Sequence, residues 1–198
     1  MFTNWRKRQA DMKLWRRART LPELADLMAR WVDGELSMWP GYRDGAAEET
    51  VEIAPTLARL NRAGFLTDQS QPGFDGVGFD GLRWQQRAAV SGLVADELLM
   101  SRIRKAGEAA GVIVLIAHPW LLPQGQGYTA TTRDGEPYTE FGAYLPPRIL
   151  RQIWAGVSRD AMKEIADAWQ VTVIDPDLGP GTRVWDALDA AVRTPATR

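Results

Sequence analysis

The residues best suited to ligand chemistry lie in the segment 60–89, where polar side chains meet glycine-rich backbone. We expect a short strand at 65–67, followed at its exit by the polar tripeptide Gln69-Ser70-Gln71. A glycine-rich arm comes next, with glycines at positions 73, 76, 78 and 81. Hydroxyl and amide groups beside backbone that permits close approach are typical of a site for a small polar ligand.

Three other side chains could do chemistry but are interpreted as structural. His118 is the only histidine and ends an apolar run. Because no nucleophile or metal partner can be assigned to it, we expect a hydrogen-bonded structural histidine rather than a general base. Asp175 and Asp177 flank a proline after a predicted strand. We expect them to shape the turn before the last helix, although strand ends are also common ligand sites.

Established catalytic and cofactor motifs are missing from the sequence. It has no GxGxxG, no GxxxxGK[ST], no HExxH and no GxSxG. It contains no cysteine, which excludes disulfides, thiolate chemistry and cysteine-based zinc sites. We also find no carboxylate cluster suited to a metal ion. The prediction is therefore that the protein requires neither a metal nor a cofactor.

Composition indicates one globular domain. The chain has 198 residues, of which 45% are hydrophobic and 25% charged, and it includes nine Trp. A net charge of −1 argues against attraction of the whole surface to nucleic acid or anionic lipid. No apolar run approaches the ~18 residues of a membrane-spanning helix, and the first residues lack the apolar core of a signal peptide. We expect a cytoplasmic protein without membrane contact.

Charge is nevertheless concentrated at the N-terminus. The first nineteen residues carry seven basic side chains and a single acid, Asp11. One hypothesis is a nucleic-acid contact. The alternative, which we adopt, is a solvated helix face whose Trp5, Met12 and Trp15 dock on the body.

Hydrophobic periodicity and capping signals locate the elements that must position these residues. Thr20 and Glu23 predict a capping box. Because Pro55 would break an established helix, the next helix either opens near residue 46 and is kinked at the proline or starts close to the proline itself. We expect helices at 20–34, 46–64, 97–110, 146–169 (broken near 156–158) and 184–192. We expect strands at 65–67, 83–94, 112–116 and 171–174, and a hairpin at 128–138. The strand 112–116 should be covered on both faces, and Leu98 should belong to the buried side of its helix.

This order predicts a single α/β (α+β) domain with a mixed β-sheet flanked by helices and an N-terminal helical extension. We place a basic, amphipathic helical segment at 1–38, the ligand-binding domain at 39–193 and a frayed tail at 194–198.

Four blocks between positions 46 and 90 carry a family resemblance. They are Glu49-Thr50, Asn61-Arg-Ala-Gly64, Leu66-Thr67-Asp68-Gln69-Ser70-Gln71-Pro72 and Trp84-Gln85-Gln86-Arg87-Ala88. Their order and spacing resemble the C-terminal regulatory domain of eukaryotic methylenetetrahydrofolate reductase. The ending, residues 169–177 followed by Val184-Trp185, resembles that domain too, and Tyr138-Thr139 with Phe141-Gly142 is similar to its Thr-Trp-Gly segment. Two departures are Gln69, where the family has Asn, and Asp68, where it has an apolar residue.

The resemblance implies binding of S-adenosylmethionine or S-adenosylhomocysteine without flavin chemistry. It implies that Glu49 and Thr50 lie near the ligand's polar end, that Thr67 and Ser70 face the ligand, and that Thr139 lies further back. A carboxylate suits the ligand's charged groups, and hydroxyls suit its ribose and carboxylate. Glu49 is also a residue that a helix first turn favours without any ligand.

Four further residues are expected to shape the site rather than to contact the ligand. They are Gln69, Gln71, Gly73 and Gln86. Gln71 and Gln86 should bond the loop backbone, and the glycines should allow close backbone approach or a positive φ.

Three functions remain in view. The first is a sensor, sequestering protein or regulatory subunit that binds the adenosyl ligand, acting with a separate enzyme partner or as a homo-oligomer. The second is an enzyme that acts on an adenosyl-type molecule in the same pocket, with His118, Glu49 or Asp175 as acid or base. The third is a nucleic-acid or protein interaction module that uses the basic N-terminal helix.

Overall fold

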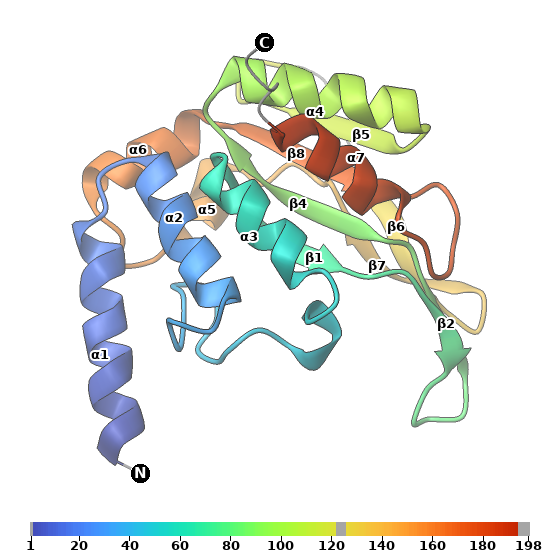
Figure 1. Ribbon diagram of the computed structural model, residues 1–198, viewed down its shortest axis with the longest axis horizontal. Coiled ribbons are helices and arrows are strands. Elements are labelled where there is room, and N and C mark those ends of the chain that lie inside the picture. Colours follow the sequence, from blue (N-terminus) through green and yellow to red (C-terminus); the bar gives the residue numbers. More distant parts are fainter. Residues whose placement is uncertain (1, 122–125, 194–198) are drawn as a thin grey trace.

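The computed structural model describes residues 2–121 and 126–193, and its centre is a four-stranded antiparallel sheet (Figure 1). Its strands, in spatial order, are β1 (Phe65–Gln71), β4 (Ala89–Val94), β8 (Trp169–Ile174) and β5 (Ile113–Ala117). The two middle strands are apolar and buried over most of their length. The predicted tail 194–198 lies outside the described residues.

A second antiparallel sheet forms an arm beside the first one. Its strands, in spatial order, are β2 (Phe74–Val77), β3 (Arg83–Gln86), β6 (Tyr128–Arg133) and β7 (Glu136–Phe141). The β6–β7 hairpin turns at Asp134 and Gly135, which have φ of 52° and 86°. Two consecutive residues with positive φ are what a two-residue hairpin turn of this kind requires, and Asp-Gly supplies them at little cost.

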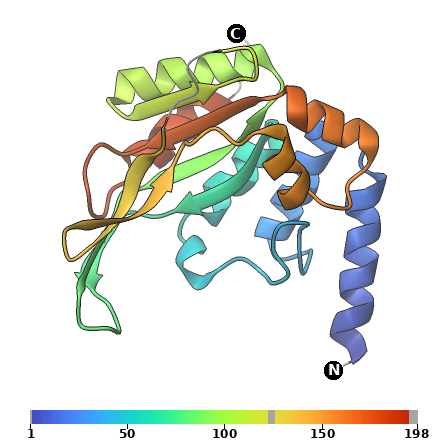
Figure 2. The ribbon, with the colours of Figure 1, turned by 180° about the vertical axis from the view of Figure 1, so that it is seen from behind.

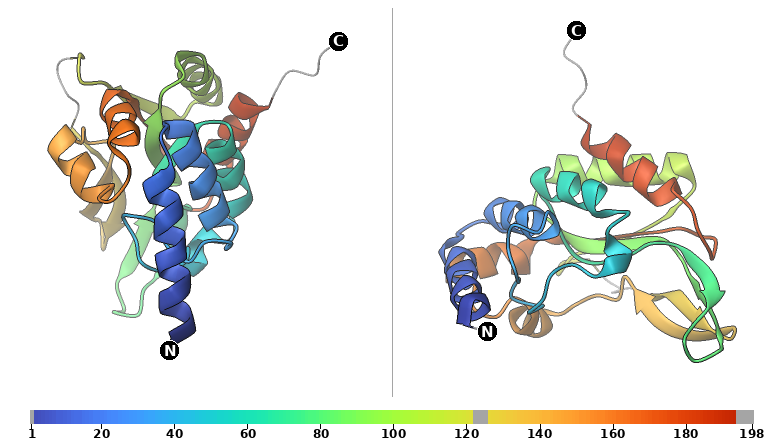
Figure 3. Two further views of the ribbon diagram at one scale, coloured as in Figure 1. Left: turned by 90° about the vertical axis from the view of Figure 1, so that its left-hand side faces the viewer. Right: turned by 60° about the horizontal axis from the view of Figure 1, so that its bottom comes forward.

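Three helices cover one face of the central sheet (Figure 3). They are α3 (Ala54–Arg62), α4 (Glu97–Ala110) and α7 (Arg183–Val192). Phe65 of β1 packs into the apolar core on this side, whereas the next residue, Leu66, packs into the core on the opposite side. The strand thus alternates between two buried faces, as the two-residue period of β-structure demands.

The opposite core is closed by helices from both halves of the chain. They are α1 (Phe2–Arg17), α2 (Leu21–Val32), α5 (Pro147–Ile153) and α6 (Arg159–Asp167). Seen from behind, α5 and α6 stand at one end and the arm sheet at the other (Figure 2). Trp15 and Trp154, both fully buried, meet here with ring centroids 6.2 Å apart. Large aromatic rings supply much of the buried apolar area on this side.

The N-terminal helix docks on the body through Trp15, and Met12 packs against the same cluster. The expectation that Trp5 also docks is wrong, because this side chain is 59% exposed. Lys7 pairs with Asp11 and Arg8 pairs with Asp44. These contacts favour the hypothesis of a helix that docks on the body through its apolar side chains.

The predicted α+β single domain is confirmed, but the single mixed sheet is wrong. The chain forms two sheets, and every strand pair in them is antiparallel. The strand predicted at 83–94 is really β3 and β4, which belong to different sheets. The break falls at Arg87 and Ala88, where the chain crosses from the arm to the central sheet.

Element boundaries also differ near the candidate site. The strand β1 runs to Gln71, so the polar tripeptide is part of the strand rather than its exit. The helix predicted from residue 46 is a short 3-10 turn, η1 (Glu48–Thr50), followed by α3, which begins at Ala54 with Pro55 in its first turn. Proline is accommodated there because its missing N–H is not needed in the first turn.

Two burial expectations are wrong as well. β5 is the edge of its sheet and is half-buried throughout, rather than covered on both faces. Leu98 is 75% exposed, while Leu99 and Ile103 carry the buried stripe of α4. Asp96 does cap this helix, and Gly111 does end it in the left-handed conformation.

Close packing of β1 against β4 gives a stability prediction. A Cβ added at Gly92 would lie 2.2 Å from the Leu66 carbonyl oxygen and 2.8 Å from the Thr67 Cα. We expect Gly92→Ala to lower the free energy of unfolding by about 1–3 kcal/mol, because the two strands must separate. Urea denaturation measures this. Gly45→Ala, which meets no heavy atom within 4 Å, is the control, and equal midpoints for the two variants would contradict the packing argument.

Candidate ligand-binding site

A hollow of about 320 Å³ lies between η1, α2 and β1. Its polar lining comes from two segments that are distant in sequence, with Glu49 and Thr50 on one side and residues 67–70 on the other. The volume falls at the lower end of the range usual for ligand pockets. The structure thus brings together four of the five side chains expected to contact a ligand.

The 3-10 turn presents Glu49 and Thr50. The Thr50 N–H donates to the Ala47 carbonyl at 2.9 Å, and the Ile53 N–H donates to the Thr50 carbonyl at 3.1 Å. Thr50 is buried and Glu49 is exposed at the rim. Within the described residues, the side chains of Glu49, Thr50 and Ser70 have no hydrogen-bond partner, so their polar atoms are open to a ligand.

Asn61 holds β1 against the end of α3. Its Nδ2 donates to the Thr67 Oγ1 at 2.7 Å and to the Leu57 carbonyl at 2.8 Å, while its Oδ1 accepts from the Thr67 N–H at 3.0 Å. Asn61 is 1% exposed. Thr67 lines the hollow, but its hydroxyl oxygen already accepts this bond, so its first role is to lock the strand. The signal for Asn61 was its place in the Asn-Arg-Ala-Gly block, which did not identify it as a site residue.

A β-bulge turns Asp68 out of the regular strand pattern. Thr67 pairs with Gly92 and Gln69 pairs with Ser91, which leaves Asp68 without a partner on β4. A bulge of this kind re-aims a side chain. Asp68 and Gln69 consequently line both the hollow and a smaller one of about 170 Å³ on the Ser91 side.

The sequence marks Asp68 only as a departure from the pattern of the resembled family, which has an apolar residue there, and not as a site residue. Burial raises the pKa of the Asp68 carboxyl to about 6, against the smaller opposite effect of the Asp68 and Gln69 backbone N–H groups. A half-buried carboxyl that titrates near neutral pH is a candidate for charge recognition or proton transfer.

The wall opposite β1 is aromatic. Trp31 meets Trp39 and Tyr42 edge-to-face, with ring centroids 6.4 Å apart in both pairs. All three rings line the hollow. A Cβ at Gly41 would lie 2.1 Å from the Trp39 ring, so only glycine permits this close backbone approach.

Gln71 bridges the two sheets. Its Nε2 donates to the carbonyls of Arg87, at 2.9 Å, and Ala130, at 3.2 Å, and its Oε1 accepts from the Thr131 hydroxyl at 3.2 Å. This side chain is used entirely for backbone and cross-sheet bonds. It therefore fits the structural role expected for it.

Gly73 and Gln86 line a neighbouring, wider hollow of about 470 Å³, which Glu49 also lines. A Cβ at Gly73 would lie 2.0 Å from the Gly179 carbonyl oxygen, so the backbone passes too close for any side chain. The Gln86 side chain lines this hollow and has no hydrogen bond to the described loop backbone, so the expectation that it bonds the loop is wrong. The main-chain carbonyl of Gln86 accepts from the Gly179 N–H.

Thr139 is the expected ligand contact that the fold does not bring to either hollow. It lies on β7 opposite Thr131. Its hydroxyl is buried without a hydrogen-bond partner, and it is absent from the lining of both cavities. The similarity of residues 138–142 to the family's Thr-Trp-Gly segment therefore did not place this side chain at the hollow.

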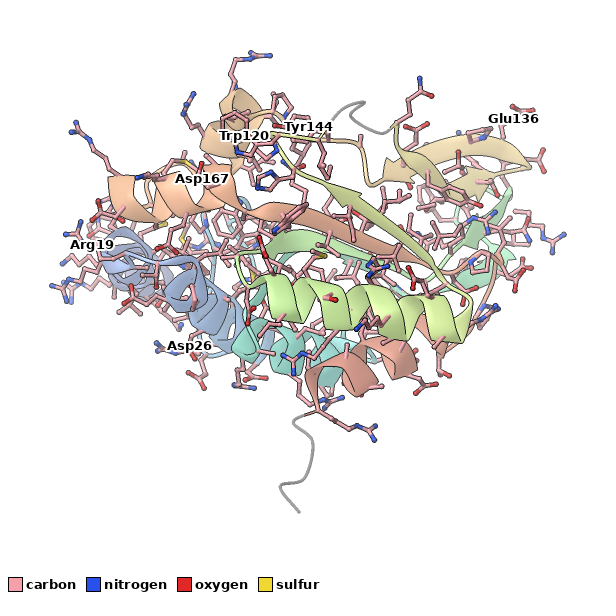
Figure 4. The ribbon with its side chains drawn as sticks, turned by 90° about the horizontal axis from the view of Figure 1, so that it is seen from above. Arg19, Asp26, Trp120, Glu136, Tyr144 and Asp167 are labelled. Carbon is pink, nitrogen blue, oxygen red and sulfur yellow. The ribbon has the colours of Figure 1, made fainter. Side chains whose placement is uncertain are left out.

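His118 and Asp175, which were proposed as acids or bases, have other partners. The His118 Nε2 lies 3.1 Å from the Asp167 carbonyl oxygen, and its ring packs 4.3 Å from that of Trp169. Trp120, which follows His118 closely in the chain, and Asp167 lie near each other in Figure 4, at the end of α6. Asp175 accepts from the Asp177 N–H at 3.0 Å, which forms the turn before α7.

Two general features of the described residues bear on function. They contain no group of three or more His, Cys, Asp or Glu side chains arranged to hold a metal ion. Among them, no helix combines the length and apolarity that crossing a membrane requires.

The Asp68 carboxyl gives a pH prediction. Its folded-state pKa lies above its ordinary value of 3.8, so between about pH 4 and pH 6 the folded state holds a proton that the unfolded state has lost. The stability contributed by Asp68 therefore falls as pH rises through this window and is constant above it. We expect Asp68→Asn to gain stability relative to the wild type between pH 4 and pH 7, by at most about 3 kcal/mol.

Urea denaturation of both proteins at pH 4, 5, 6 and 7 measures this difference. Asp75→Asn is a control of opposite sign, because a hydrogen bond from Arg83 lowers the pKa of the Asp75 carboxyl. A stability difference between Asp68→Asn and the wild type that does not change with pH would contradict the assignment.

One comparison with known proteins gives a match over nearly the whole chain. No curated protein matches the sequence. A family model described as "Domain of unknown function (DUF6919)" matches residues 10–195, a span that includes both sheets and the whole lining of the hollow. The chain therefore belongs to the DUF6919 family.

Proposed function

We propose that the protein binds S-adenosylmethionine or S-adenosylhomocysteine without catalysis, in the hollow between η1 and β1. The observation that carries this proposal is the convergence of Glu49 and Thr50 with Thr67 and Ser70 on one cavity. Those are the residues that the resemblance to the methylenetetrahydrofolate reductase regulatory domain implicates, and they come from segments seventeen residues or more apart in the chain.

The charges of the lining support an amino-acid ligand over a nucleotide. Among the described residues, Glu49 and Asp68 are the only lining side chains that carry a carboxyl group, and none carries a basic group. They can accept hydrogen bonds from the ligand's ammonium group, while the hydroxyls of Thr50 and Ser70 and the amide of Gln69 can bind its carboxylate and ribose. The carboxylates of Glu49 and Asp68 would repel phosphate groups, and no lysine or arginine of the described lining would offset that repulsion.

The neighbouring hollow offers room for the rest of the ligand. Glu49 stands at the boundary of the two cavities, and the wider one is lined by Phe74 and Trp84 of the arm sheet. Aromatic faces of this kind can stack on a purine ring. A ligand that joins a flat heterocycle to a charged amino-acid chain matches this division into two parts.

In the cell, the proposed role is that of a sensor, a sequestering protein or a regulatory subunit for a separate enzyme, with self-association as a further option. The absence of cysteine is consistent with a reducing cytoplasm, where we place this role.

An enzyme in the same pocket is the second candidate, and one observation favours it. The Asp68 carboxyl, whose pKa is about 6, is suited to general-base chemistry near neutral pH. Incubation with labelled S-adenosylmethionine followed by chromatography separates the two functions, because a binding protein returns the ligand unchanged. Product formation that Asp68→Asn abolishes would establish the enzyme.

Calorimetry with each ligand tests the proposed binding. Glu49→Gln and Ser70→Ala should each weaken binding by about tenfold, since each removes one polar contact. Glu136→Gln is the matched control, because Glu136 lies at the tip of the β6–β7 hairpin, away from α2 and α6 (Figure 4), and should bind like the wild type. The proposal would be refuted if neither ligand, at millimolar concentration, gave a heat of binding to folded protein. ATP serves as the nucleotide control.

A further inference from the structure

The hollow combines an aromatic wall with acidic groups. Trp31, Trp39 and Tyr42 form one side, while Glu49 and Asp68 stand at the 3-10 turn and on the bulged strand. The family resemblance implicates neither the three rings nor Asp68 as ligand contacts. They therefore add information about the ligand's chemistry that comes from this structure alone.

The rings are set at an angle to one another rather than stacked. Trp31 is inclined to Trp39 by 70° and to Tyr42 by 83°. Because the rings meet edge-to-face instead of stacking, they form an aromatic corner along the hollow that all three line. The negative face of an aromatic ring attracts a cation, and corners of this kind suit alkylated onium ions, which are weakly hydrated.

This corner is held in place by its own contacts. The Trp31 Nε1 donates to the Asp44 carbonyl at 3.0 Å, and the Asp44 carboxylate pairs with Arg8 at 2.9 Å. Trp39 and Tyr42 exchange two backbone hydrogen bonds of 3.0 Å each. A site that is already formed loses little conformational entropy when a ligand binds.

Resting on the proposed function, we propose that this corner binds the sulfonium centre, so that the protein distinguishes S-adenosylmethionine from S-adenosylhomocysteine by charge. The two ligands share the adenosine, the ammonium group and the carboxylate. They differ only in the methyl group and positive charge on sulfur. The ammonium group needs hydrogen-bond acceptors, which Glu49 supplies, whereas the sulfonium has no N–H and gains from aromatic faces and a nearby carboxylate.

Calorimetry with two matched ligand pairs tests this selectivity. The first pair is S-adenosylmethionine and S-adenosylhomocysteine. The second is S-methylmethionine and methionine, which isolates the sulfonium from adenosine. We expect the charged member of each pair to bind about tenfold more tightly than the neutral one, the size of a partly desolvated cation–aromatic contact.

Two variants of Tyr42 locate the effect. Tyr42 is 47% exposed, so its replacement is tolerated better than that of the two tryptophans. Tyr42→Leu should reduce the preference for the charged ligand to about twofold, while Tyr42→Phe, which keeps the ring, should retain it. Circular dichroism and thermal unfolding check that both variants fold. If Tyr42→Leu does not fold, the two ligand pairs on the wild type decide the question.

The outcomes separate this inference from the proposed function. Equal binding of the two adenosyl ligands would overturn the charge selectivity and leave the adenosyl-binding function intact. Failure of both adenosyl ligands, with S-methylmethionine still preferred over methionine, would overturn the adenosyl function and support sulfonium recognition. No binding of any of the four compounds would overturn both.

Discussion

The carboxamide of Asn61 is the contact on which the geometry of the hollow depends. It is almost fully buried and links the last turn of α3 to both the backbone and the hydroxyl of Thr67. A buried amide must satisfy its own donors and acceptor, so this position admits few other side chains. Because β1 is anchored there, the residues that follow Thr67 are delivered to the same place relative to α2 and η1.

Immediately beyond that anchor, the strand departs from regular pairing. The bulge at Asp68 places a carboxyl between two cavities, at the cost of burying a group that water would otherwise solvate. Gly92 on the partner strand lets β1 approach closely at the same level. The irregular position and the glycine opposite it together give the hollow an acidic floor.

The arm sheet depends on a different set of bonds. Gln71 and Arg87 hold the point where the chain leaves one sheet and enters the other, through bonds to carbonyls of β6 and of the 175–176 turn. Gly73 lets the backbone pass against Gly179 at this junction. The position of Phe74 and Trp84, and with it the wider hollow, follows from this crossing.

Local patterns in the sequence determined most of the elements. The capping box at Thr20, the Asp96 and Gly111 caps, the Asp134-Gly135 turn and the apolar stripes all act within a few residues, so they can be recognised without a fold. The grouping of Glu49, Thr50, Thr67 and Ser70 came instead from the resemblance to a known domain, which carries tertiary information that local patterns do not. Only the tertiary structure decided that residues 83–94 divide between two sheets, that Asp68 occupies a bulge, and that Trp31, Trp39 and Tyr42 close the hollow. These features arise from pairing and packing between segments far apart in the chain, where periodicity and local propensity give no signal.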